Sequence, residues 1–153
     1  MNLLVRLPAL AARVPCVVSS TYEVAIVTGG SCGAGREIAR TLGSRGYAVV
    51  VVYLCDQGEA EAAVEEILAA NGTALAVRAD VTDELDVERL FDETASAFGG
   101  VDVVVHAAVR GTSVVNRQAA RQLRHGGAIV DVTSSDIADV VALLDRWRRS
   151  RGE

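Results

Sequence analysis

The sequence predicts an α/β protein built on a doubly wound parallel sheet of about five strands. Half of the 153 residues are hydrophobic and only 4% are aromatic, which suits layers of aliphatic side chains around a sheet. From residue 23 onward, short apolar runs alternate with amphipathic segments, as in a series of βαβ units. Glycines stand at most junctions between them. A chain of this length favours one domain.

The apolar runs predict the strands of this sheet. The run AVVVVYLC at residues 48–55 is continuously apolar and rich in β-branched side chains. This pattern is typical of a strand that is buried on both faces of a parallel sheet. The expected strands are Val24–Thr28, Ala48–Cys55, Thr73–Ala79, Val101–Ala107 and Ala128–Thr133.

The segments between these runs have the period of amphipathic helices. In the first of them Ile38, Ala39 and Leu42 fall on one face, and Gly46 follows at the usual position for a helix end. The expected helices are Gly35–Arg45, Gln57–Ala70, Asp83–Phe98, Thr112–Arg124 and Asp136–Arg149. Strands and helices in this order predict right-handed crossovers between parallel strands.

Residues 1–22 differ in character and are expected to form a disordered extension ahead of a single domain at residues 23–153. Both prolines of the chain, Pro8 and Pro15, lie in this extension. A signal peptide is one alternative, but Arg13 and Pro15 interrupt the apolar run that it would need. A start codon placed too early is another alternative. Three cysteines without a C-x-x-C pair argue against a disulfide framework and a metal site, so a cytoplasmic location is expected.

The charged residues exclude several classes of function. The net charge of −5 speaks against a nucleic-acid partner, because proteins that bind a phosphate backbone present a basic face. No apolar run approaches the roughly 20 residues of a membrane span. All 15 basic residues are arginine, so no mechanism that needs a lysine, including a P-loop, is open to this chain.

The stretch VTGGSCGAGREIA at residues 27–39 is typical of a loop that holds a phosphate. Gly29 would permit a tight turn, Gly33 a close approach of a pyrophosphate, and Gly35 close packing of helix on strand. The N-terminus of the following helix would offer free N–H groups and partial positive charge. The candidate cofactor-binding residues of this loop are Thr28, Gly29, Ser31, Cys32, Gly33, Ala34 and Gly35.

The spacing of Thr28, Gly29, Gly33 and Gly35 resembles the short-chain dehydrogenase/reductase family. Other positions of residues 23 to about 149 extend the resemblance. After the third strand, Asp80 and Val81 resemble the family's adenine contact. After the fourth, His106, Ala107 and Ala108 resemble an altered Asn-Asn-Ala-Gly motif. Ser135 falls where the family has its active-site serine.

This resemblance implies a Rossmann-like fold and a dinucleotide, NAD(P), as cofactor. The reaction that it implies is hydride transfer between the nicotinamide and a small carbonyl or alcohol. The end of the second strand, where an acid would bind the 2′-hydroxyl of NAD, carries Tyr53, with Asp56 three residues later. The missing acid favours NADP slightly, and Arg36 is the nearest candidate for its 2′-phosphate.

The resemblance also shows which parts the chain lacks. The family's Tyr-x-x-x-Lys segment is absent, since Tyr22, Tyr47 and Tyr53 all precede the third strand and no lysine exists. A phenol with its usual pKa is a poor base at neutral pH without a nearby cation. One gap lies between Val109 and Gly111, where the family has a long loop and a catalytic Asn. A second gap follows Ser135 and should contain the Tyr/Lys helix, a further strand and the substrate loop.

The sequence therefore predicts a family member that is shortened internally and on its C-terminal side. Loss of a covering helix should expose apolar sheet surface and an edge, so we expect a homo-oligomer or another association through that face. Three interpretations stay open: an oxidoreductase, a non-catalytic module that binds a dinucleotide or a partner, and a degenerate remnant of such an enzyme.

Three single residues also have a second interpretation. Ser135 is either the catalytic serine or the N-cap of the helix that begins at Asp136. His106 either contacts the cofactor or forms a structural hydrogen bond. Cys32 is either a redox-sensitive thiol at a helix N-terminus or only a small residue of the loop.

Overall fold

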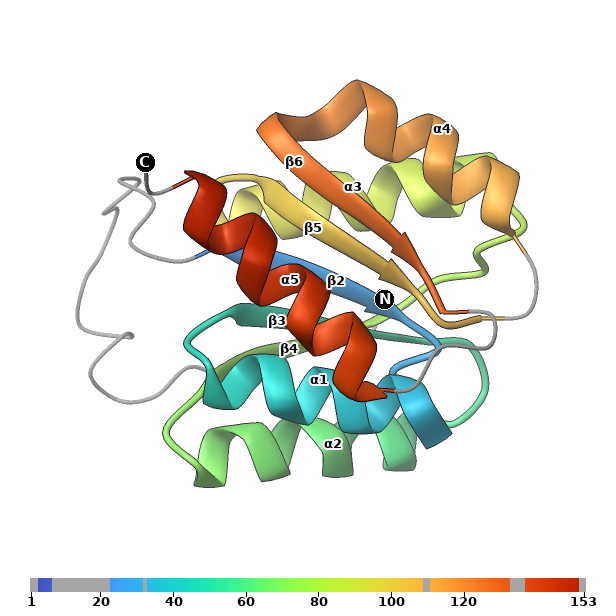
Figure 1. The fold of residues 1–153 in the computed structure, drawn as a ribbon. Helices are drawn as coiled ribbons and strands as arrows, with labels where there is room; N and C mark the ends of the chain where they lie inside the picture. Colours follow the sequence, from blue (N-terminus) through green and yellow to red (C-terminus); the bar gives the residue numbers. More distant parts are fainter. Residues whose placement is uncertain (1–2, 7–22, 32, 109–110, 133–136, 152–153) are drawn as a thin grey trace.

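The computed structural model describes residues 3–6, 23–31, 33–108, 111–132 and 137–151. Its strands form one six-stranded sheet in the order β1-β4-β3-β2-β5-β6. All neighbours pair in parallel except β1, which pairs antiparallel with β4 at one edge. The predicted doubly wound α/β architecture is confirmed (Figure 1).

The helices and strands follow the predicted alternation. The strands are β1 Leu3–Arg6, β2 Val24–Thr28, β3 Ala48–Tyr53, β4 Thr73–Arg78, β5 Val101–His106 and β6 Leu123–Asp131. The helices are α1 Gly33–Ser44, α2 Gln57–Ala69, α3 Glu84–Phe98, α4 Thr112–Gln122 and α5 Ile137–Arg151. No helix in the described ranges is both long and apolar enough to cross a membrane.

Each face of the sheet carries its own apolar core. On one face Val49 and Val51 of β3 pack with residues of α1, α2 and α5, among them Leu42 and Leu144. On the other face Val50 and its neighbours pack with α3 and α4. Strands such as β3 are therefore buried on both sides, as the continuous apolar run predicts (Figure 1).

The expected disordered extension is corrected at residues 3–6, which form β1. This strand pairs antiparallel with β4, with Leu3 opposite Val77 and Arg6 opposite Ala74. Its backbone therefore covers the edge of β4 that would otherwise have no hydrogen-bond partner. Residues 7–22 lie outside the described part of the chain, so the division into extension and domain stays a prediction.

The boundary between α4 and β6 also differs from the prediction. The expected helix reached Arg124, but α4 ends at Gln122 and Leu123 is already extended, opposite Val101 of β5. The guanidinium of Arg124 donates hydrogen bonds to Asp102 at 3.3 Å and to the carbonyl of Phe98 at 3.2 Å. These long-range contacts favour the extended backbone over a last helical turn.

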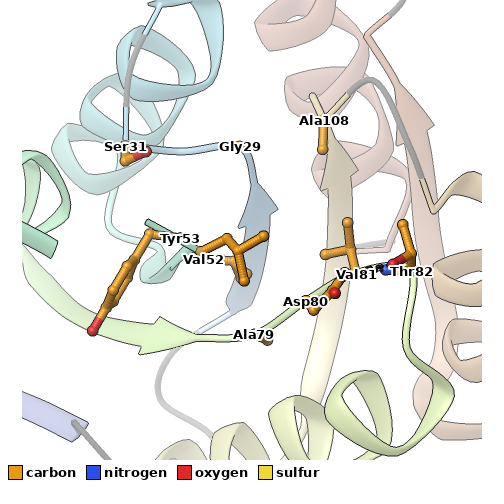
Figure 2. A pocket seen from close by; sticks show the side chains of 10 residues that line it. Gly29, Ser31, Val52, Tyr53, Ala79, Asp80, Val81, Thr82 and Ala108 are labelled. Carbon is orange, nitrogen blue, oxygen red and sulfur yellow. Dashed lines mark hydrogen bonds between the residues drawn. The ribbon is translucent and has the colours of Figure 1, made fainter. Parts of the chain in front are cut away.

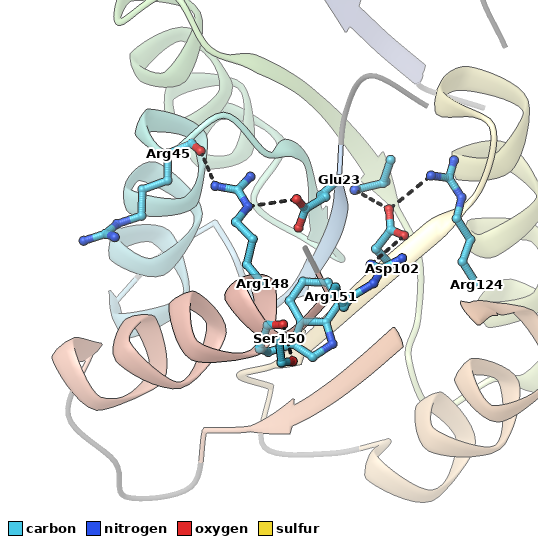
Figure 3. A network of polar contacts seen from close by, with 9 residues as sticks. Glu23, Arg45, Asp102, Arg124, Arg148, Ser150 and Arg151 are labelled. Atoms are coloured by element: carbon cyan, nitrogen blue, oxygen red, sulfur yellow. Dashed lines mark hydrogen bonds and ion pairs between the residues drawn. The ribbon is translucent and has the colours of Figure 1, made fainter. Parts of the chain in front are cut away.

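A buried carboxylate connects α5 and β6 to the amino ends of the central strands. The side chain of Asp102 is 2% exposed. It accepts a hydrogen bond from the N–H of Val24 at 2.8 Å and pairs with Arg124 and Arg151, each at 3.3 Å. These contacts bring together β2, β5, β6 and the end of α5 (Figure 3).

A second arginine of α5 reinforces this attachment. Arg148 donates from Nε to Glu23 at 2.9 Å and from Nη1 to the carbonyl of Arg45 at 2.8 Å (Figure 3). Its guanidinium also lies 4.3 Å from the ring centroid of Tyr47. The Tyr47 hydroxyl is buried and has no hydrogen-bond partner within the described ranges.

Replacing Tyr47 by Phe should change the alkaline stability of the protein. Burial is the main cause that raises the pKa of Tyr47 to about 12. An unfolded tyrosine ionises near pH 10, so the wild type should lose stability as the pH rises from about 10 to about 12. Tyr47→Phe should remove this part of the loss and leave stability at neutral pH within about 1 kcal/mol of the wild type. Urea unfolding at neutral and alkaline pH measures the stability at neutral pH and its loss above pH 10. Parallel pH profiles for the two proteins would contradict the expectation.

Candidate functional site

The glycine-rich turn joins β2 to α1 at the carboxyl edge of the sheet. A Cβ atom built on Gly35 would lie 2.1 Å from the carbonyl oxygen of Gly29, so only glycine lets α1 approach the turn this closely. Gly33 begins α1 with a φ of 60°, and no atom lies within 4 Å of where its Cβ would be. Within the described residues, the space beside Gly33 at the first turn of α1 therefore has room for a ligand.

A cavity of about 390 Å³ lies beside this turn. Its walls come from the carboxyl ends of β2, β3 and β4 and from the residue two positions after β5 (Figure 2). In doubly wound sheets this edge is where ligands bind, and small-molecule pockets have volumes of about 300–1,000 Å³. The lining residues are Gly29, Ser31, Val52, Tyr53, Leu54, Ala79, Asp80, Val81, Thr82 and Ala108.

The structure brings some of the predicted cofactor residues together at this cavity. Six of them line it: Gly29, Ser31, Tyr53, Asp80, Val81 and Ala108. Their roles in binding stay predictions. Cys32 and Ser135 lie outside the described residues. The sequence analysis missed four lining residues, although each is next to a predicted one at a strand end: Val52, Leu54, Ala79 and Thr82.

Thr28 and His106 do not line the cavity but connect the two strands beside it. Thr28 Oγ1 lies 2.7 Å from His106 Nδ1, and both side chains are buried. The N–H of Ala107 donates to Thr28 Oγ1 at 3.2 Å. These bonds fix the end of β5 against the end of β2 and bring the backbone N of Ala108 within 3.1 Å of where a Gly29 Cβ would lie. Of the two interpretations of His106, this geometry favours the structural one.

Asp80 places a negative charge on the cavity wall. Its Oδ1 accepts hydrogen bonds from the backbone N–H of Thr82 at 2.9 Å and from the Thr82 hydroxyl at 2.6 Å. The hydroxyl bond and then the backbone bond hold the pKa of Asp80 below its usual range, so it is ionised at neutral pH. Its second oxygen remains available to a donor on a ligand.

Tyr53 gives the cavity an uncharged side chain at the end of β3. It is 5% exposed and belongs to the apolar core on the α1 and α2 face. Burial, followed by the charge of Glu61, raises the pKa of Tyr53. The phenol is therefore neutral at physiological pH and puts no negative charge where an acid would meet a ribose hydroxyl.

Arg36, the sequence-based candidate for a 2′-phosphate, is engaged elsewhere. Its guanidinium pairs with Glu59 at 2.7 Å and with Glu66 at 2.5 Å, both on α2. It does not line the cavity. In this structure Arg36 therefore connects α1 to α2, and its assignment to a 2′-phosphate stays a prediction.

Comparison with known proteins decides the family. The family model described as short chain dehydrogenase matches residues 23–122, which contain the glycine turn and every residue that lines the cavity. The chain belongs to the short-chain dehydrogenase/reductase family.

Several known proteins are similar to the chain in sequence. An uncharacterised oxidoreductase of Methylorubrum extorquens is 34% identical over 142 residues, which cover 78% of this chain and 57% of that protein. Versicolorin reductase of Emericella nidulans is 36% identical over 141 residues, which cover 77% of this chain and 53% of that protein. The chain thus spans about half the length of the curated relatives it matches.

Several solved structures share the fold. One from Burkholderia cenocepacia, in complex with NADP, superposes with a TM-score of 0.67 at 34% identity, covering 71% of this chain and 54% of that chain. A blue fluorescent protein from a metagenomic library, in complex with NADPH, gives a TM-score of 0.66 at 28% identity, covering 73% of this chain and 56% of that chain.

The two tyrosines of the described residues are not placed for proton transfer at the cavity. Tyr47 directly precedes β3 at the amino end of the parallel strands, opposite the edge that carries the cavity. Tyr53 reaches the cavity but is largely buried in the core and has no lysine beside it. Tyr22 lies outside the described residues.

Proposed function

We propose that the chain binds NAD(P) with the adenosine half in the cavity at the carboxyl edge of the sheet. One observation carries this proposal: the cavity adjoins a glycine turn that leaves the start of α1 open, at the edge where doubly wound sheets bind nucleotides. The complexes of family members with NADP and NADPH support the same cofactor.

The described residues fit a dinucleotide in three ways. At Gly33, the described residues other than its chain neighbours leave room beside the first N–H groups of α1, where a pyrophosphate would accept hydrogen bonds. Val52 and Val81 offer apolar walls for a base, and Asp80 offers a carboxylate oxygen for an amino group. The cofactor, when bound, would supply or accept a hydride at its nicotinamide ring.

The reaction that we propose by family membership is reduction of a carbonyl or oxidation of an alcohol of small size. A group on the protein must then donate or accept a proton at the substrate oxygen. Ser135 is the residue of this chain that we propose to polarise that oxygen. The general acid is not the family's Tyr/Lys pair, because the chain has no lysine.

A second candidate function is a binding module without catalysis. The positions of Tyr47 and Tyr53 favour it, since one lies at the far edge of the sheet and the other is buried in the core. The same cavity serves both functions equally. Only a measurement of turnover distinguishes an oxidoreductase from a binding module.

Thermal melts and turnover assays with NADPH and NADH test this proposal. A ligand that binds only the folded protein at 100 times its Kd should stabilise it by about 2.7 kcal/mol. A nucleotide-dependent shift together with carbonyl-dependent loss of the reduced nicotinamide absorbance would support the oxidoreductase. A shift without turnover would favour the binding module. No shift from a cooperative melt would contradict both, and no cooperative melt would indicate a degenerate remnant.

We also propose that the chain self-associates through the region of β6. Within the described ranges this strand pairs with β5 on one side only and forms an edge of the sheet. Ile129 on β6 is 38% exposed. An unpaired edge with an apolar side chain beside it favours pairing with another chain.

Light scattering should therefore give a mass above that of one chain, and Ile129→Lys should reduce it. The charge would oppose the approach of a second edge. Leu85→Lys, at an exposed position of α3, should leave the mass unchanged. A wild type that stays monomeric at high concentration and binds no hydrophobic dye would contradict the association.

A further inference from the structure

Arg78 places a cation beside the cavity that the sequence analysis did not single out. It is the last residue of β4 and lies opposite Tyr53, the last residue of β3. Its Nε donates a hydrogen bond of 3.1 Å to the carbonyl oxygen of Leu54, a residue of the cavity wall. This bond holds the guanidinium at the strand end beside Leu54, although Arg78 itself is not among the residues that line the cavity.

Arg78 forms no direct ion pair within the described ranges, although its charge and that of the Asp80 carboxylate attract each other. Most arginines of the described ranges pair with carboxylates, as Arg36 does with Glu59 and Glu66. For Arg78 no ion pair with a carboxylate occurs within those ranges, and the residue is exposed. Since Nε holds the Leu54 carbonyl, the two terminal nitrogens can serve a further acceptor.

The position of this cation matches a known requirement of dinucleotide sites. In a doubly wound sheet, an acid at the end of the second parallel strand binds the ribose 2′-hydroxyl of NAD, whereas a nearby arginine accommodates the 2′-phosphate of NADP. Here that strand end carries the neutral Tyr53, and Arg78 lies directly across from it. A planar guanidinium suits two oxygens of a phosphate.

We propose that Arg78 binds the 2′-phosphate of NADP(H) and makes the cavity prefer NADP(H) to NAD(H). This inference rests on the proposed dinucleotide function. It replaces Arg36 as the phosphate ligand and assigns the cofactor preference to a residue on β4, far along the chain from the glycine turn.

Calorimetric titration of NADP⁺, NAD⁺, 2′,5′-ADP and ADP into the wild type and R78Q tests the proposal. R121Q is the matched control, because Arg121 is exposed on α4 and, within the described ranges, also forms no ion pair. We expect R78Q to weaken NADP⁺ and 2′,5′-ADP about tenfold or more and to change NAD⁺ and ADP less than about threefold. R121Q should bind all four ligands as the wild type does, and inorganic phosphate should not compete at comparable concentrations.

Several outcomes would overturn the inference, and they separate it from the proposed function. If NADP⁺ binds equally to wild type and R78Q, or if R78Q weakens both nucleotides alike, the assignment to Arg78 fails while dinucleotide binding stands. A wild type that prefers NAD⁺ overturns it in the same way. If R36Q rather than R78Q removes the preference, the phosphate ligand is Arg36. If the folded wild type binds none of the four ligands, the proposed function fails as well.

Discussion

Gly35→Ala is expected to destabilise the protein by about 3 kcal/mol or more and to abolish nucleotide binding. The new Cβ would lie 2.1 Å from the carbonyl oxygen of Gly29, a backbone atom that cannot rotate away. Either α1 must move off β2 or the turn must change shape. Both movements displace the first N–H groups of α1 from the place where a pyrophosphate would meet them.

The control for this variant is Gly58→Ala. Gly58 lies in α2, and no atom comes within 4 Å of where its Cβ would be. Alanine there should leave stability unchanged or raise it by up to about 1 kcal/mol, with nucleotide affinity unaffected. Urea unfolding and calorimetry measure the two effects. A Gly35→Ala protein that keeps wild-type stability and affinity would show that the turn is not packed as described.

Asp102→Ala is expected to cost about 3–5 kcal/mol of unfolding free energy, because it removes one side of a buried ion network. Arg124 and Arg151 would lose their carboxylate, and the N–H of Val24 would lose its acceptor. The variant should also weaken the attachment of α5, which reaches the sheet through Arg151 and Arg148. Hydrogen exchange should then increase along α5 before the central strands open.

Asp145→Asn provides the comparison for a carboxylate at the surface. Asp145 pairs with Arg45, but both side chains are partly exposed to water. Such pairs contribute about 0–1 kcal/mol, so this variant should melt close to the wild type. If the unfolding free energy of Asp102→Ala is also within about 1 kcal/mol of the wild-type value, the network does not hold α5 on the sheet.

The central strands were predictable because their signals are local, but their ends were not. Val24–Thr28 has the same limits in sequence and structure, since a glycine turn follows it. The run at residues 48–55 continues past Tyr53, where β3 ends. Leu54 is apolar yet 43% exposed on the cavity wall, so hydrophobicity alone does not mark the end of the strand.

Elements that depend on distant partners were missed. Leu3–Arg6 becomes a strand only because β4 offers an unpaired edge about seventy residues later, as the pairing of Leu3 with Val77 shows. Leu123 and Arg124 carry no strand signal of their own. Arg124 leaves the helix because its partner, Asp102, is buried on a different strand.

In the candidate site, too, local features could be predicted from the sequence and long-range contacts could not. The spacing of the glycines predicts the phosphate turn, because each glycine permits a local backbone conformation or a close approach that a side chain would prevent. The choice between Arg36 and Arg78 could not be read from spacing. Arg36 lies in the helix that follows the turn, but it pairs with Glu59 and Glu66. Arg78 comes next to Tyr53 and Leu54 of the cavity wall only through the pairing of β3 with β4.

The most direct test of the account is a calorimetric titration of the wild-type protein with NADP⁺. The account predicts saturable binding of one nucleotide per chain, with competition by 2′,5′-ADP, because the adenosine half occupies the cavity beside the glycine turn. Protein that melts cooperatively but shows no binding up to about 1 mM NADP⁺, an affinity weaker than about −4 kcal/mol, would contradict the account.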